Sequence, residues 1–117
     1  GLTIYDYSLD EHDRTVAYSL SIPFVSTFTF AAVMKHQDAP GTTFKRHMQI
    51  AKCVLNEDNY LLQEILFNPY THDSVAQIRT ELKELLEIID NKDAEGMRKY
   101  LKKIRNNVKS DIEIHRQ

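Results

Sequence analysis

The feature that most constrains this chain is a run of 20 residues without a charge, which lies between Arg14 and Lys35. A helix of this length is long enough to cross a lipid bilayer. However, six of the 20 residues are serine or threonine, Pro23 stands near the middle, and no basic cluster marks a cytoplasmic flank. We therefore predict a helix that is covered by protein, and no membrane-spanning segment.

The same run also raises the choice between a strand and a helix. Propensity alone would allow a strand over residues 19–25. The length of the run instead predicts a helix that begins near Ser8 or Asp10 and bends at Pro23. Such a helix is apolar on more than one face, and a domain of 117 residues has little other material to cover it. The sequence therefore predicts a homodimer formed through this first helix.

The rest of the chain predicts further helices and an all-α fold. In two stretches, apolar residues recur every three or four positions, which is the spacing of one helix face. These two sets are Val75, Ile78, Leu82, Leu85 and Ile89, with Asp73 or Ser74 as the cap, and Met97, Leu101, Ile104, Val108 and Ile112. Shorter helices are predicted over residues 43–55 and 59–67, after the loop that ends at Pro40-Gly41 and before Asn68-Pro69.

These helices predict a five-helix domain over residues 9–117, with a long first helix kinked at Pro23 and intertwined in a homodimer. We expect residues 1–8 to be a linker from a preceding domain. The last two helices are joined by a turn at residues 91–93, so they should pack antiparallel. Six acidic residues in 81–95 and six basic residues in 98–109 support this pairing. Binding of nucleic acid to the basic residues is the less favoured alternative, because a solvent-exposed face next to an acidic helix is the more common reason for such a run.

The composition limits the chemistry that this chain can perform. The single cysteine, Cys53, excludes an internal disulfide and a multi-cysteine metal site, and three glycines cannot form a Gly-rich phosphate-binding turn. The five histidines show no metal-ligand spacing, and no nucleophile motif is present. We therefore expect no catalytic residue, metal site or cofactor site in this chain. We also expect a cytoplasmic location, because the first residues do not form a secretory leader.

A cluster of potential cations follows the Pro40-Gly41 loop. Lys45, Arg46 and His47, together with Lys52, lie within about two turns of the predicted helix. Fixed positive charge of this kind suits a small carboxylate substrate, because it offsets the cost of removing the carboxylate from water. The alternative is a solvent-exposed face without a ligand.

Four motifs, in this order, resemble the C-terminal helical domain of prephenate dehydrogenases. They are Glu11-His12-Asp13-Arg14-x-x-Ala17, Ile22-Pro23-Phe24, Gly41-x-x-Phe44-Lys45 and the run Asn56-Glu57-Asp58-Asn59-Tyr60-Leu61-Leu62-Gln63-Glu64-Ile65. The resemblance covers the chain from about Leu9 to about His115, and the acidic and basic helices at its end also fit this domain.

The resemblance implies an enzyme of tyrosine biosynthesis that oxidatively decarboxylates prephenate to 4-hydroxyphenylpyruvate and transfers hydride to NAD or NADP. The cofactor and the catalytic histidine would belong to a Rossmann domain that precedes this chain, so this chain alone should be inactive. The helical domain would dimerise through its first helix and close the substrate pocket. No nucleic acid and no membrane would be partners.

Two departures from the family pattern concern the substrate pocket. A histidine found in the first helix of family members is replaced by Phe24, and the family's substrate-binding arginine falls at Gln49 or Cys53, depending on the alignment. Neither residue is cationic. We therefore expect Lys45, Arg46 or Lys52 to hold a substrate carboxylate instead.

Ser26 and His12 are further candidates for substrate binding. Ser26 could equally bond a carbonyl of the kinked helix, and His12 could simply belong to the first turn of that helix. The departures also leave an alternative function, a helical interaction module of a diverged dehydrogenase that acts on another substrate, such as arogenate, or on none.

Overall fold

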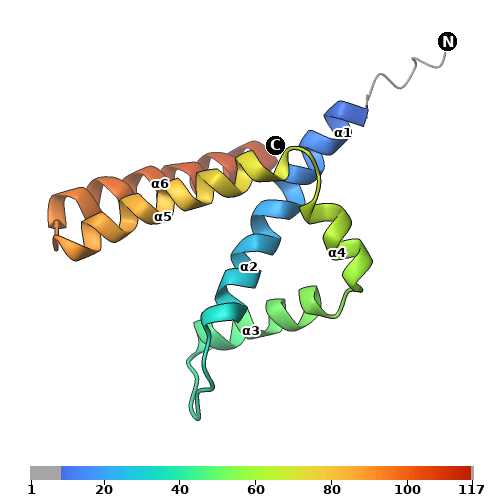
Figure 1. Ribbon diagram of the computed structural model, residues 1–117. Helices are drawn as coiled ribbons and strands as arrows, with labels where there is room; N and C mark the ends of the chain where they lie inside the picture. The colour runs from blue at the N-terminus through green and yellow to red at the C-terminus, as the bar shows by residue number, and fades with distance from the viewer. Residues whose placement is uncertain (1–8, 117) are drawn as a thin grey trace. The chain divides into compact units, whose positions relative to one another are not determined.

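The computed structural model describes residues 9–116 of the chain, and the side chains of residues 9–112 (Figure 1). The predicted all-α fold is confirmed: the chain is 83% helical, has no strand within this range, and contains five helices when the first is counted as one. The predicted linker, residues 1–8, lies outside the described residues. The described residues form two compact units, which divide between Ile78 and Arg79.

The first helix is continuous from Leu9 to Val33 and has three parts: α1 (Leu9–Val16), the π-helical segment η2 (Ala17–Ser21) and α2 (Ile22–Val33). The prediction of a helix over a strand is confirmed. Where a bend was predicted at Pro23, the structure has a π-helical turn just before it. Because Pro23 has no N–H and its ring clashes with the preceding turn, regular α-helical bonding cannot run through it, and the wider turn accommodates the mismatch.

The π-helical segment carries the two most deeply buried residues of the first unit, Ala17 and Ser21. Ser21 is fully buried, and its hydroxyl lies 2.9 Å from the hydroxyl of Thr71, which in turn donates to the Ile65 carbonyl at 3.1 Å. Ala17 is buried beside it. Because a buried hydroxyl is costly unless it is hydrogen-bonded, this network fixes η2 against the end of α4 (Asn59–Leu66) and the start of α5 (Thr71–Asp90).

The turn between α4 and α5 is held to α1 by a second set of contacts. The Asn68 side chain donates to the Asp13 carbonyl at 2.8 Å and accepts from the Tyr70 N–H at 2.9 Å. The Tyr70 hydroxyl donates to Asp10, and the Arg14 guanidinium lies 5.0 Å from the centre of the Tyr70 ring. The hydrogen bond with Tyr70, and then the charge of Asp10, raise the pKa of Arg14. These contacts set the path of the chain into α5.

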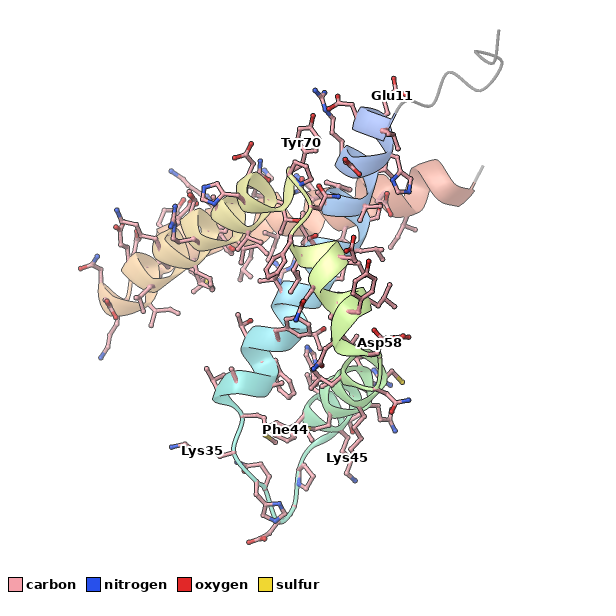
Figure 2. The ribbon with its side chains drawn as sticks, turned by 45° about the vertical axis from the view of Figure 1, so that its right-hand side comes forward. Glu11, Lys35, Phe44, Lys45, Asp58 and Tyr70 are labelled. Carbon is pink, nitrogen blue, oxygen red and sulfur yellow. The ribbon has the colours of Figure 1, made fainter. Side chains whose placement is uncertain are left out.

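Helix α3 (Thr42–Leu55) packs against α2, while α4 contacts η2 (Figures 1 and 2). The ring of Phe30 meets the ring of Phe44 edge to face at 5.5 Å and the ring of His47 at 5.4 Å. Asp58 caps α4 by accepting from the Leu61 N–H at 2.8 Å. Both helices begin and end within one residue of the predicted positions.

The second unit is an antiparallel hairpin of α5, from residue 79 onward, and α6 (Ala94–Arg116), as predicted (Figure 1). The Lys103 ammonium joins the two helices by bonding Glu81 at 2.9 Å and pairing with Glu84 at 3.5 Å. The turn contains Lys92 at a φ of 49°, and Asp93 caps α6 by accepting from the Gly96 N–H at 2.9 Å.

One sequence prediction for α5 is wrong. The helix begins at Thr71, so Asp73 and Ser74 lie within its first turn and do not cap it. The buried Thr71 hydroxyl lies 2.9 Å from the Ser21 hydroxyl, and this contact fixes the start of the helix. The apolar face of α5 is only partly covered: Leu82 and Ile89 are more than half exposed, while Glu81 and Ile88 are half-buried. A single neighbouring helix covers only part of a broad apolar face.

Candidate functional site

A cavity of about 300 Å³ lies at the corner between the end of α2, the following loop and α3. Its apolar walls are half-buried and come from both sides of the corner. The walls are Met34, Pro40, Phe44 and Met48. The contact of Phe44 with Phe30 holds α3 against α2 and so fixes the cavity. Its volume is at the lower end of the range typical of small-molecule sites.

The polar lining of this cavity is positively charged. Lys45, Gln49 and Lys52 recur at steps of four and three along α3, which places all three on one helix face. Neither lysine has a salt bridge among the described residues, and no aspartate or glutamate lines the cavity. The arrangement therefore offers two ammonium groups above an apolar wall, which suits a small ligand with a carboxylate and an apolar ring.

The loop adds His36 and Gln37 to the lining. The His36 ring lies 3.1 Å from the Asp38 carboxylate, and both side chains are strongly exposed. The Gln37 side chain donates to the Lys35 carbonyl at 3.3 Å. These contacts are local to the loop, so they shape the rim of the cavity.

The other residues predicted to bind substrate lie elsewhere. Arg46 is exposed on α3 but is not among the residues that line the cavity. The Ser26 hydroxyl donates to the Ile22 carbonyl at 2.9 Å, which is the local alternative considered for it. His12 is exposed on α1 and lies 3.7 Å from the Asp13 carboxylate. The structure therefore brings Lys45 and Lys52 together, and a substrate role for Arg46, Ser26 and His12 stays a prediction.

Sequence reasoning did not find most of the cavity's lining. Met34, His36, Gln37 and Pro40 belong to the loop and the helix end before it, and their position depends on the path of a loop that carries no periodic pattern. Met48 could have been found, because it lies one turn from both Lys45 and Lys52. His47, which the sequence grouped with the cations, turns to Phe30 and bonds the Thr43 carbonyl at 2.9 Å.

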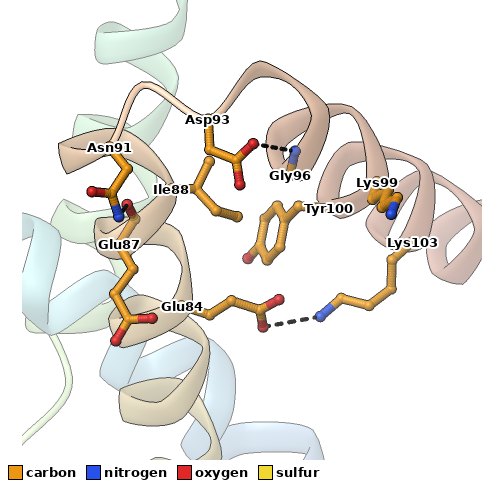
Figure 3. A pocket seen from close by; sticks show the side chains of 9 residues that line it. All are labelled: Glu84, Glu87, Ile88, Asn91, Asp93, Gly96, Lys99, Tyr100 and Lys103. Carbon is orange, nitrogen blue, oxygen red and sulfur yellow. Dashed lines mark hydrogen bonds and ion pairs between the residues drawn. The ribbon is translucent and has the colours of Figure 1, made fainter.

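A second cavity, of about 420 Å³, lies at the turn end of the α5–α6 hairpin (Figure 3). Part of its charged lining already has partners within the unit: Lys103 pairs with Glu84, and Asp93 caps the Gly96 N–H. The hydrogen bond to Glu81 raises the pKa of Lys103, so this ammonium stays charged. Because the lining mixes three carboxylates with two ammonium groups, this larger cavity is the weaker candidate for a site that binds carboxylates.

Cofactor and metal sites find little support in the residues that the structure describes. No group of three histidine, cysteine, aspartate or glutamate side chains is placed to hold a metal ion within this part of the chain. A dinucleotide needs glycines that allow close approach of its phosphates. A side chain at Gly41 would meet nothing within 4 Å, and one at Gly96 would meet only Asp93. Neither glycine forms a cradle, so the residues described here do not fit NAD or NADP.

The first helix is also a functional feature, because it is largely uncovered. Leu9–Val33 is long and apolar enough to cross a membrane, and only 11% of its most apolar 18-residue stretch is buried. Across the described residues, the buried apolar side chains are Ala17, Ala51 and Ile65. Isolated exposed apolar residues are normal, but a long apolar helix of which so little is buried is typical of an interface.

Comparison with protein-family models, with curated proteins and with solved structures finds no match to this chain. The resemblance to prephenate dehydrogenases therefore depends on the four sequence motifs alone.

Proposed function

We propose that this chain is a homodimerisation domain whose α2–α3 corner binds a small ligand that bears carboxylates. Following the resemblance of its four motifs, we assign it to a prephenate dehydrogenase, as the C-terminal domain for dimerisation and for the substrate pocket. That enzyme would be cytoplasmic, would use NAD or NADP and would act in tyrosine biosynthesis. The observation that carries the proposal is the uncovered first helix, Leu9–Val33. The alternative is an interaction module of a diverged dehydrogenase that acts on arogenate or on no substrate, which the uncharged Phe24 and Gln49 favour.

The free energy gained by removing apolar side chains of the first helix from water supports a dimer. Tyr18, Leu20 and Val33 are exposed on it, and removing one large apolar side chain from water is worth about 1.5–3 kcal/mol. A second copy of the chain offers a matching apolar helix, and each such contact occurs twice in a twofold interface. Several side chains of this kind are enough to offset the cost of association.

The position of α3 supports a protein partner over a lipid bilayer. Helix α3 packs on α2 through Phe30 and Phe44, so a bilayer around α2 would also surround α3. The basic residues Lys45, Arg46 and Lys52 of α3 would then have to leave water near the end of the span, which hydrocarbon disfavours. A second copy imposes no such cost.

The cavity at the α2–α3 corner supports the substrate part of the proposal. Of the two positions at which the family's arginine can be aligned, Gln49 lines the cavity and Cys53 does not. Lys45 and Lys52 lie one turn on either side of Gln49, so two ammonium groups stand where one guanidinium is expected. The chain offers binding groups only, so reduction of NAD or NADP and the catalytic histidine are assigned to a preceding domain.

A charge placed in the first helix tests the dimer. We expect the protein to sediment at twice its 13.7 kDa mass, and Leu20→Glu to raise the dimer dissociation constant on the order of a hundredfold or more. Tyr18→Glu repeats the test at a more exposed position that is less important for folding. Gln63→Glu, which adds the same charge on α4, is the matched control. A wild-type monomer, or co-flotation of the protein with phospholipid vesicles, would contradict the proposal.

Binding of prephenate tests the cavity. We expect Lys45→Ala combined with Lys52→Ala to weaken prephenate binding on the order of tenfold to a hundredfold, because each charged hydrogen bond contributes about 1.5–3 kcal/mol. Arg46→Ala is the matched control, since it removes a neighbouring cation that does not line the cavity. Titration calorimetry measures both. Equal binding by the double variant would exclude the cavity as the carboxylate site, and tighter binding of arogenate would favour the alternative substrate.

A further inference from the structure

The hairpin carries an apolar stripe that is uncovered in this chain. Leu82, Leu86 and Ile89 follow one another at steps of four and three, so they lie on one side of α5. All three are more than half exposed, while Leu85 and Ile88, which face α6, are half-buried. The stripe therefore lies outside the contact between the two helices of the hairpin.

Charges beside the stripe are arranged so that two copies complement each other. Lys83 lies three residues before Leu86, and Asp90 lies four residues after it. Both side chains are exposed, and neither has an ion pair or hydrogen bond among the described residues. They are seven residues apart, or about 10 Å along the helix, which is too far for a direct bond within one chain.

We infer that the hairpin associates with a second copy of itself through antiparallel packing of α5 on α5, centred on Leu86. In this arrangement Leu82 of one copy meets Ile89 of the other, and Lys83 meets Asp90, twice in each twofold interface. A parallel arrangement would instead place these charges on opposite sides of the interface, where Lys83 cannot reach Asp90 of the other copy. The charges thus favour one orientation, and the interface is separate from the one proposed for the first helix.

Disulfide trapping tests the contact. In the full chain with Cys53→Ser, we expect Leu86→Cys to form a covalent dimer on mild oxidation. Glu87→Cys places the same thiol on the far side of α5 and is the control, for which we expect little cross-linking. Equal rates for the two thiols would overturn the inference.

A charge swap tests the orientation within the Leu86→Cys protein. Lys83→Asp alone and Asp90→Lys alone should each slow the cross-link several-fold, since each creates two like-charged pairs. The double variant restores both pairs and should restore the rate. Because residues 83 and 90 cannot pair within one chain, this recovery requires a second copy, and failure to recover would overturn the inference. The first-helix dimer contributes equally to all four proteins, so loss of that dimer would leave the pattern intact.

Discussion

The first helix and the hairpin both expose apolar side chains, but they differ in how charge accompanies them. Residues 15–34 of the first helix contain no charge, whereas the hairpin places a charged residue within one turn of every exposed apolar one. The hairpin's charges also form ion pairs within the unit, such as Lys103 with Glu81 and Arg98 with Glu95. The surface of the hairpin can therefore remain exposed to water when no partner is bound, while the first helix needs a stable interface that covers it.

The largest change in stability is expected at the one buried polar contact of the first helix. Ser21→Val adds volume at a fully buried site and removes the hydroxyl that pairs with Thr71. We expect a loss of about 1–3 kcal/mol in the free energy of unfolding, measured with urea. Ser26→Ala removes an exposed hydroxyl from the same helix and should stay within about 0.5 kcal/mol. A similar loss for both variants would contradict the importance of the buried contact.

The two helix caps allow a matched comparison between the units. Asp58 in the first unit and Asp93 in the second each accept from the N–H three residues later, at 2.8 and 2.9 Å. We expect Asp58→Ala and Asp93→Ala to cost about 1 kcal/mol each. Amide hydrogen exchange should report the first change in α4 and the second in α6. If Asp93→Ala also accelerated exchange throughout the first unit, the division into two units would be wrong.

The smallest effect is the pH dependence of the hairpin. The hydrogen bond to Glu81 raises the pKa of Lys103 in the folded protein. The stabilisation by this bond is therefore present below the pKa of an unfolded lysine, about 10.4, and is lost as the pH rises through the pKa of the folded protein. The hydrogen bond from Arg98 lowers the pKa of Glu95, so its stabilisation is present above about 4.3 and is lost as the pH falls.

The side chains of Lys103, Arg98 and Glu95 are exposed, so we expect the free energy of unfolding to fall only slightly at the two ends of the pH range. The protection of α6 amides against exchange should therefore be greatest between about pH 4.3 and 10.4 and should weaken outside these limits. Lys103→Met should remove the alkaline loss and Arg98→Met the acidic one. An unchanged profile in these two variants would show that the ion pairs do not act in solution.

The sequence predicted the parts of the structure that depend on local patterns. The bounds of α3 and α4 and the hairpin turn follow from helical spacing and from breakers such as Pro40-Gly41. The π-helical turn and the start of α5 depend on the contact of Ser21 with Thr71, which lie 50 positions apart. No pattern within one helix carries that information.

The cavity, too, could be predicted only in part from the sequence. Its wall on α3 follows from the spacing of one helix, but Met34 and Pro40 reach it through the path of a loop. The exposure of Leu82 and Ile89 was also beyond sequence reasoning, because periodicity marks a face as apolar without saying how much of it a neighbour covers.

The central claim is that two copies of the first helix cover each other, and isotope-filtered NMR on a mixture of labelled and unlabelled protein tests it most directly. The rings of Phe24 and Phe28 are half-buried on α2, 6.3 Å apart. The account predicts nuclear Overhauser effects between these rings in one copy and first-helix side chains in the other. If every such effect arose within one chain, the first helix would not be the dimer interface.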